Sequence, residues 1–210
     1  MITSNKNSYS ASFTSGGLLF PEFDALIPIL ISENKYELLN REILENKYLK
    51  INSESSRKRI VSELKKRAKY TDLVFYDFYS VSTAQQKKLL LFYLMLKVYP
   101  LVFTFHFDVT VDNWKKGVNN IDPYNYQMKL DELSANHQNV DKWTDQTKKK
   151  VISVYNVMLT QAGLIKNKTL TPIQTQEQFW CFFFNNDAKW FLDACLLYNE
   201  SKKRLQNYCL

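Results

Sequence analysis

One ten-residue pattern occurs twice in this sequence, as SESSRKRIVS at residues 53–62 and as TDQTKKKVIS at residues 144–153. The two stretches match in residue type at nearly every position, with hydroxyl residues and an acid first, then three basic residues, two aliphatic residues and a serine. A Ser or Thr oxygen accepts hydrogen bonds from free backbone N–H groups, and an acid interacts favourably with the helix dipole. The repeat therefore predicts two capped helices, the first beginning at Ser53 or Ser55 and the second at Thr144.

Each expected helix has an apolar face. In the first copy the apolar residues recur at helical spacing as Ile60, Leu64 and Ala68. In the second copy the apolar face is wider and consists of Val151, Val154, Tyr155, Met158, Leu159 and Ala162. A helix with one apolar face packs that face against a protein core. Both helices are therefore expected to be amphipathic, with a second face in solvent.

The solvent face repeats as well, as Lys58, Ser62, Lys65 and Lys69 in the first copy and as Lys149, Ser153, Asn156 and Thr160 in the second. Short side chains let a helix approach DNA closely, lysines reach phosphates, and Asn pairs with an adenine edge in the major groove. We therefore predict two helices that bind double-stranded DNA. The residues expected to contact it are Ser56, Arg57, Lys58, Arg59, Ser62, Lys65, Lys66, Lys69, Thr147, Lys148, Lys149, Lys150, Ser153 and Asn156. A second interpretation is that the two helices have basic surfaces that resemble each other by chance.

The positive charge of the chain is concentrated in the first copy. The net charge is +7, and residues 57–69 (RKRIVSELKKRAK) contain seven basic side chains and one acid. Positive charge clustered on one short element indicates a polyanion-binding surface more strongly than the same charge dispersed along the chain. The alternative is a solvated helix face with no ligand.

The second copy is followed by a further signal. Its helix is expected to end at Gly163, because glycine at the C-terminus of a helix readily adopts a left-handed conformation. Residues 164–165 and 170–171, on either side of Asn167-Lys168, then have the length of a small hairpin. This arrangement favours a winged helix-turn-helix, with the helix of the second copy as its recognition helix.

Turn-forming residues are scarce, with four glycines and five prolines in 210 residues. We therefore expect an all-α fold, a compact multi-helix globular protein with two helix-turn-helix-like elements. Further helices are predicted at residues 35–46, 84–98, 101–109, 175–185 and 187–207. The polar segment 115–141 is the expected junction between an N-terminal half (1–118) and a C-terminal half (119–210), although one compact domain is the alternative.

Several classes of active site are missing from the sequence. The four glycines, at positions 16, 17, 117 and 163, allow neither a phosphate-binding loop nor a dinucleotide fingerprint. His106 and His137 lie in unrelated contexts, and His106, within an aromatic run, is expected to be a partly buried structural residue. We therefore expect no enzyme, no cofactor and no metal site.

The cysteines and the apolar segments bear on location. Cys181, Cys195 and Cys209 contain no CxxC pair and are expected to be unpaired thiols of a reducing compartment. The longest apolar run, at residues 89–96, is far shorter than the roughly 20 residues of a membrane helix, and the N-terminus lacks a signal pattern. The expected location is cytoplasmic, without a membrane partner.

Four stretches together resemble the BrxA family, a small component of bacteriophage-exclusion (BREX) defence systems. They are YSASFTSGGLLFPEFDALIPIL (9–30), SSRKRIVSELKKRA (55–68), QQKKLLLFYLMLKVYPLVFTFHFDV (85–109) and TKKKVISVYNVMLTQAGLI (147–165). The resemblance implies an all-helical, NusB-like protein with helix-turn-helix elements that binds double-stranded DNA. It also implies partners within the same system, namely an adenine methyltransferase, a phosphatase-like protein and an ATPase, and it supplies no catalytic residues.

The sequence thus favours a non-catalytic DNA-binding component of such a system. Two alternatives remain. One is a protein–protein adaptor whose basic helices meet acidic partners, and the other is an RNA-binding protein that stacks exposed bases on aromatic side chains.

Overall fold

The computed structural model describes residues 9–210 of the protein, and helices dominate this range. The sheet in it consists of two antiparallel strands of two residues each, β1 (Ile165–Lys166) and β2 (Thr169–Leu170). The expected all-α fold is confirmed. The expectation that the N-terminus has no signal pattern concerns residues that lie largely outside the described range.

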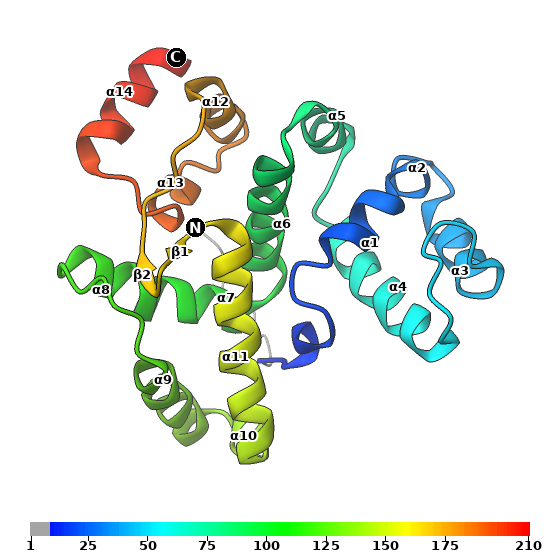
Figure 1. Ribbon diagram of the computed structural model, residues 1–210, viewed down its shortest axis with the longest axis horizontal. Helices are drawn as coiled ribbons and strands as arrows, with labels where there is room; N and C mark the ends of the chain where they lie inside the picture. The colour runs from blue at the N-terminus through cyan, green and yellow to red at the C-terminus, as the bar shows by residue number, and fades with distance from the viewer. Residues whose placement is uncertain (1–8) are drawn as a thin grey trace. The chain divides into compact units, whose positions relative to one another are not determined.

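The chain divides into two compact units (Figure 1). One unit spans Ser12–Val98, and the other consists of Tyr99–Leu210 together with the described residues up to Ala11. The expected junction after residue 118 lies within the second unit, so a domain boundary at that place stays a prediction. The two repeated stretches lie in different units.

The unit Ser12–Val98 is built around one buried helix. Its elements are η1 (Ser12–Ser15), α1 (Phe20–Ala25), α2 (Ile27–Leu30), α3 (Lys35–Glu45), α4 (Glu54–Ala68), α5 (Leu73–Val81) and α6 (Ala84–Val98). Every residue of α6 from Leu89 to Leu96 is buried, which is typical of a helix with neighbours on all sides. The run LLLFYLML is therefore a core helix, as its short length indicates.

Buried charged side chains hold the loops of this unit. Glu42, 2% exposed, accepts hydrogen bonds from the backbone N–H groups of Tyr48 and Leu49 at 2.8 Å each. Arg67, fully buried, donates to the backbone carbonyls of Gly17 and Leu18. Buried polar groups are costly unless they are paired, so both charges stabilise the unit by satisfying loop backbone groups.

The second unit contains the other repeated helix. Its elements are α7 (Pro100–Thr104), the π-helical segment η2 (Phe105–Val111), α8 (Asp112–Lys115), α9 (Pro123–Asn136), α10 (Gln138–Asp141), α11 (Asp145–Ala162), the strands β1 and β2, α12 (Glu177–Asn185), α13 (Trp190–Ala194) and α14 (Asn199–Cys209). The aromatic segment 101–109 is helical, as expected. In Figure 1, α9 and α10 lie beside the first turns of α11, and the β1–β2 hairpin lies at its far end.

One helix of this unit was not predicted, and one expected helix was wrong. The polar segment 115–141 contains α9, because the Asp122 side chain caps it by accepting from the N–H of Tyr124 and Pro123 fits the first turn. The expected helix at 187–207 is interrupted, since Leu196 adopts a left-handed conformation (φ 60°) between α13 and α14.

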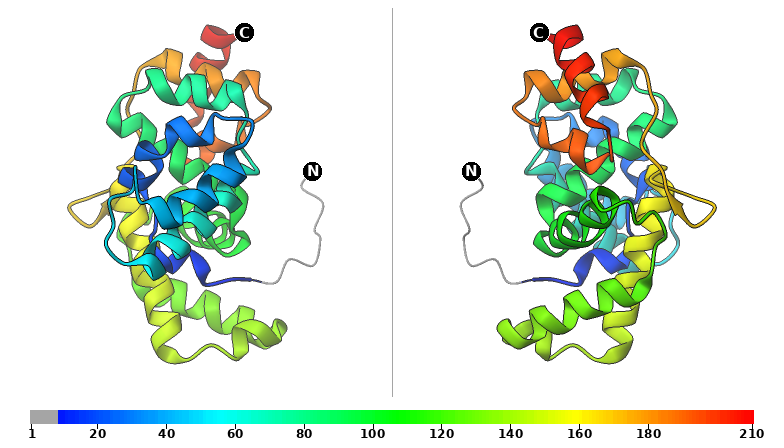
Figure 2. Two further views of the ribbon diagram at one scale, coloured as in Figure 1. Left: turned by 90° about the vertical axis from the view of Figure 1, so that its right-hand side faces the viewer. Right: turned by 90° about the vertical axis from the view of Figure 1, so that its left-hand side faces the viewer.

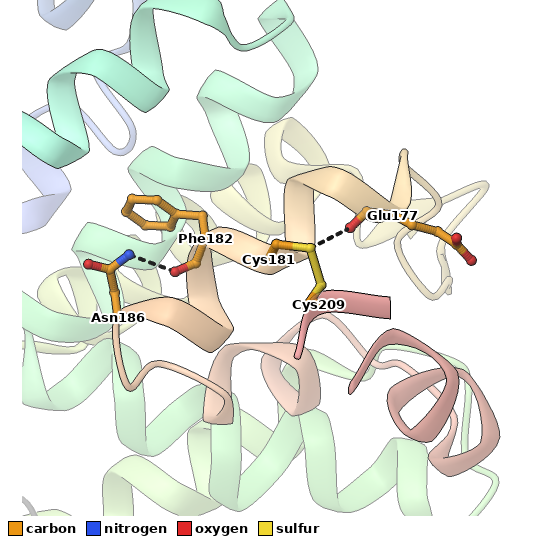
Figure 3. The surroundings of a disulfide bond; sticks show 5 residues. All are labelled: Glu177, Cys181, Phe182, Asn186 and Cys209. Carbon is orange, nitrogen blue, oxygen red and sulfur yellow. Dashed lines mark hydrogen bonds between the residues drawn. A yellow bond between two sulfur atoms is a disulfide. The ribbon is translucent and has the colours of Figure 1, made fainter. Parts of the chain in front are cut away.

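The expectation of three unpaired thiols was also wrong. Cys181 of α12 and Cys209 of α14 form a disulfide, with their Cα atoms 5.0 Å apart (Figure 3), whereas Cys195 is free and buried. The two residues are separated by 28 positions, and only the packing of α14 against α12 brings them together. No spacing pattern in the sequence predicts this pair.

Few other interactions hold α14. Leu205 is its buried residue, and two ion pairs join the helix to its neighbours, Lys202 with Asp193 at 2.7 Å and Arg204 with Glu177 at 3.0 Å. The Arg204–Glu177 pair is largely exposed and contributes little to stability, whereas the Lys202–Asp193 pair is half-buried. The disulfide is therefore the main attachment of the last turn of α14.

In the described part of the chain, no single helix is long and apolar enough to cross a membrane. Taken together, α6 and the helical segment Pro100–Lys115 are long and apolar enough, but they are bent by 108° relative to each other.

Reduction of the disulfide is expected to loosen α14 locally. With dithiothreitol, or in Cys209→Ser, amide hydrogen exchange of residues 199–209 should accelerate at least about tenfold, because one buried leucine and two ion pairs remain to hold the helix. Exchange of α11, which has no disulfide, serves as the internal control. Equal exchange of α14 with and without reductant would show that the bond does not hold it.

Candidate nucleic-acid interface

Both repeated stretches form the helices that their residues predict. Ser53 accepts a hydrogen bond from the backbone N–H of Ser56 at 3.3 Å, and Thr144 accepts one from the N–H of Thr147 at 3.2 Å. The apolar faces are buried, apart from Val154, which is half-buried. The predicted caps, starting points and inward faces of α4 and α11 are therefore confirmed.

On α4, most of the residues expected to contact DNA are accessible. Lys58, Arg59, Ser62 and Lys69 are exposed, and Ser56, Lys65 and Lys66 are half-buried. Lys58 forms an ion pair with Glu54 at 2.6 Å, and this hydrogen-bonded contact lowers the pKa of the Glu54 carboxyl. Lys65 donates to the side-chain oxygen of Asn40 at 2.5 Å. The stripe Lys58, Ser62, Lys65 and Lys69 thus reaches solvent, with two of its lysines engaged by neighbours.

Arg57 does not lie on this stripe. It is 7% exposed, and its guanidinium donates to the carbonyls of Ile43, Ile51 and Asn52 at 2.7, 2.5 and 3.0 Å. The sequence places it among the phosphate contacts because it stands in a basic run. The structure instead gives it the task of closing the loop between α3 and α4.

Two further basic residues of the 57–69 cluster have internal roles. Arg67 is buried against Gly17 and Leu18. Lys66 donates to Glu63 at 2.6 Å and to Ser12 at 2.9 Å. The surface of α4 is consequently less basic than the count of its charged residues suggests.

On α11, three of the six predicted residues, Lys149, Ser153 and Asn156, line a groove. Lys149, Lys150 and Ser153 are exposed, and Thr147, Lys148 and Asn156 are half-buried. The groove lies between α9 and α11 and has a volume of about 690 Å³. Its lining residues are Pro123, Tyr124, Gln127, Lys149, Ile152, Ser153, Asn156, Val157, Thr160 and Gln161. The second copy of the polar stripe therefore forms one wall of a concave surface, and none of these lining residues is acidic.

The other wall of the groove was missed at the level of sequence. Tyr124 and Gln127 come from the first turns of α9, in a segment that was interpreted as a polar junction. Asp122-Pro123, a helix cap followed by a proline suited to the first turn, predicts the start of α9 but not its packing beside α11.

The predicted hairpin is also confirmed. Gly163 ends α11 in a left-handed conformation (φ 84°), and Ile165 pairs with Leu170. Asn167 and Lys168 both have positive φ, 51° and 63°, as a two-residue hairpin turn requires. In both views of Figure 2 the hairpin lies beside the end of α11 and extends away from it.

A third segment supports the hairpin base. Asn120 forms an isolated bridge with Thr169, and the N–H of Leu170 donates to the carbonyl of Asn119 at 2.7 Å. These backbone contacts join the segment before α9 to the hairpin. The α9 wall of the groove and the hairpin are therefore connected by hydrogen bonds.

A buried chain of hydrogen bonds positions α11. Tyr155 of α11 lies 2.8 Å from Nδ1 of His106 and 2.7 Å from the hydroxyl of Thr110. The Thr110 hydroxyl also lies 2.9 Å from that of Tyr126 in α9. The carbonyl of Ala194 lies 2.7 Å from Nε2 of His106. The chain therefore links α9, η2, α11 and α13.

The protonation of His106 follows from these contacts. A carbonyl can only accept, so Nε2 carries the proton and Nδ1 accepts from the hydroxyl of Tyr155. Complete burial lowers the pKa of His106 to about 4, against a smaller opposing effect of the Ala194 carbonyl. Burial also raises the pKa of Tyr155 well above its usual value. His106 is thus the structural residue that the sequence predicts, although it is fully rather than partly buried.

Comparisons with known proteins agree with the sequence resemblance. The BrxA family model matches residues 7–187. A protein of Bacillus cereus (strain H3081.97) named BREX protein BrxA is 25% identical over 162 residues, which are 76% of this chain and 80% of that protein. A crystal structure of an uncharacterized protein from Magnetospirillum magneticum has a TM-score of 0.73 at 17% identity, over 90% of this chain and 98% of that one. The last similarity shows the fold alone.

The buried and exposed arginines of α4 should differ sharply in their effect on stability. Arg57→Gln leaves loop carbonyls unsatisfied and is expected to lower the free energy of unfolding by about 2–4 kcal/mol. Arg59→Gln, at an exposed position two residues away, should change it by less than about 0.5 kcal/mol. Urea denaturation of both variants tests this, and equal effects would contradict the internal role of Arg57.

His106 should make stability depend on pH. Because its pKa in the folded protein is about 4 and its ordinary value is 6.5, the unfolded chain binds the proton first. The stabilisation is present in full above about pH 6.5 and is lost as pH falls toward 4, with about 2 kcal/mol lost between pH 7 and pH 5. His106→Gln should flatten this slope and His137→Gln should keep it, in urea titrations at each pH. An unchanged slope in His106→Gln would contradict this account.

Proposed function

The chain belongs to the BrxA family, and from this premise we propose that it is a non-catalytic, double-stranded-DNA-binding component of a BREX phage-defence system. The observation that carries the proposal is the solvent face of α11. This face combines exposed lysines, short polar side chains and a groove without acidic residues, and a projecting hairpin lies at its end. A helix, a tight end and a small hairpin in this order form the recognition part of a winged helix-turn-helix.

The first turns of α11 supply phosphate contacts. Lys149 and Lys150 are exposed there, and free backbone N–H groups at a helix N-terminus attract anions. In the hairpin, Lys166 and Lys168 are exposed as well. An 18-residue helix is about 27 Å long, so the two lysine groups meet phosphates that lie well apart on the duplex.

The middle of α11 lies against base edges. Ser153 is exposed and short, and it allows close approach. Within the described part of the chain, Oδ1 of Asn156 has no hydrogen-bond partner. An unsatisfied buried acceptor is costly, and after rotation of the side chain this oxygen would accept from the exocyclic amine of adenine.

The stripe of α4 provides a second contact. Lys58, Ser62, Lys65 and Lys69 repeat the pattern of α11 on the other unit. The lysines of this stripe are suited to phosphate contacts. We assign it to sequence-independent affinity.

A protein partner is the second candidate, and a specific observation favours it. Leu73, Val74 and Val81 of α5 are 66%, 55% and 81% exposed. Exposed apolar side chains gathered on one short helix are typical of a protein interface. We propose that other components of the same defence system, in the cytoplasm, are the partners of this helix.

The salt dependence of duplex binding tests the proposed function. Fluorescence anisotropy with a labelled duplex at several salt concentrations should give a steep loss of affinity, with a slope of about −0.9 per phosphate contacted. Lys149→Glu with Lys150→Glu should reduce the magnitude of that slope by about two contacts and weaken binding at least tenfold.

The matched control for this test is Lys189→Glu with Lys203→Glu, which makes the same charge change at exposed positions outside α11. Binding should change much less in this variant. Lys58→Glu with Lys65→Glu measures the contribution of α4 separately. Equal losses in the α11 and control variants, or stronger competition by single-stranded RNA than by duplex DNA, would contradict the proposal.

A further inference from the structure

If α11 enters a major groove, one DNA strand must pass between α11 and α9. An α-helix with its side chains is about 10–12 Å across, and the major groove is about 12 Å wide. The helix therefore fills the major groove, and a sugar–phosphate backbone runs along each of its flanks. On the flank that faces α9, the space open to that backbone is the groove lined by both helices.

The lining of the groove suits a sugar–phosphate backbone. Deoxyribose is largely apolar, and it alternates with phosphates that carry one negative charge each. The groove offers apolar surface from Pro123, Tyr124, Ile152 and Val157, and its polar lining residues are Gln127, Lys149, Ser153, Asn156, Thr160 and Gln161. Ser153 and Asn156 are assigned to base edges, and the Thr160 hydroxyl donates to the carbonyl of Asn156. Lys149, Gln161 and the second amide N–H of Gln127, whose first donates to Asp131, are the donors left for the backbone. No carboxylate among these residues repels a phosphate, and the one formal charge is the positive charge of Lys149.

The α9 wall begins at a helix N-terminus. Asp122 caps this helix, and one oxygen of its carboxylate accepts from the N–H of Tyr124 at 2.9 Å. Tyr124 itself is 63% exposed, so its ring and hydroxyl are available to a ligand in the groove.

We propose that the groove between α9 and α11 seats the sugar–phosphate backbone of one DNA strand, with Tyr124 and Gln127 as contacts from α9. This inference rests on the proposed function and extends it. Recognition then involves two helices, since α11 lies in the major groove and α9 holds the strand beside it. The fixed separation of the two helices selects a duplex over a flexible single strand.

The test compares two variants of α9 that each add one negative charge, one inside the groove and one outside it. Tyr124→Glu places a carboxylate in the groove, at a position near a helix N-terminus where an acid is well tolerated. Met128→Glu makes the same change four residues later on the same helix, at a residue that is 54% exposed and does not line the groove. Duplex affinity is measured by fluorescence anisotropy at one moderate salt concentration.

We expect Tyr124→Glu to weaken binding at least tenfold and Met128→Glu to weaken it by less than about threefold. Tyr124→Ala, which removes the ring without adding charge, should give an intermediate loss. Circular dichroism melts of all three variants establish that they are folded, and Tyr124→Ala gives an independent readout if the glutamate variant is not.

The possible failures are distinct. If Tyr124→Glu and Met128→Glu weaken binding equally while Lys149→Glu with Lys150→Glu still weakens it at least tenfold, the groove does not hold a strand but the proposed function stands. If the unaltered protein shows no salt-dependent duplex binding, the proposed function fails and the groove proposal fails with it.

Discussion

The relative position of α9 and α11 depends on a buried chain of hydrogen bonds. The chain runs from Tyr126 of α9 through Thr110 to Tyr155 of α11, and on through His106 to the carbonyl of Ala194. Each buried hydroxyl or imidazole left without a partner would cost about 1–3 kcal/mol. All of these buried groups have hydrogen-bond partners only when α9 and α11 stay at a fixed distance from each other. That separation sets the width of the groove, so the geometry of the candidate interface follows from the interior of the unit.

Charged residues have two different tasks in the unit Ser12–Val98. Glu42, Arg57 and Arg67 are buried and satisfy loop backbone groups, whereas Lys58 and Lys69 remain in solvent. A basic residue of a surface helix and a basic residue that closes a loop look alike in a sequence. The basic run at residues 57–69 therefore overstates the positive charge that α4 presents to a ligand, because some of its basic residues are buried.

The local features were predictable from sequence, and the contacts between elements were not. The caps at Ser53 and Thr144, the end of α11 at Gly163 and the hairpin around Asn167 follow from residue types at fixed spacing. The groove wall on α9, the burial of Arg57 and the Cys181–Cys209 disulfide depend on packing between segments distant in the chain. The disulfide argues against the proposed cytoplasmic location, because such bonds are uncommon in a reducing compartment.

The central claim is that the solvent face of α11 lies against a DNA duplex. Site-specific photocrosslinking tests it most directly, with a photoreactive amino acid in place of Ser153 and, as control, in place of the exposed Lys203 of α14. The account predicts crosslinks to a labelled duplex from position 153, suppressed by excess unlabelled duplex, and few from position 203. Crosslinking from position 153 that does not exceed that from position 203 would contradict the account.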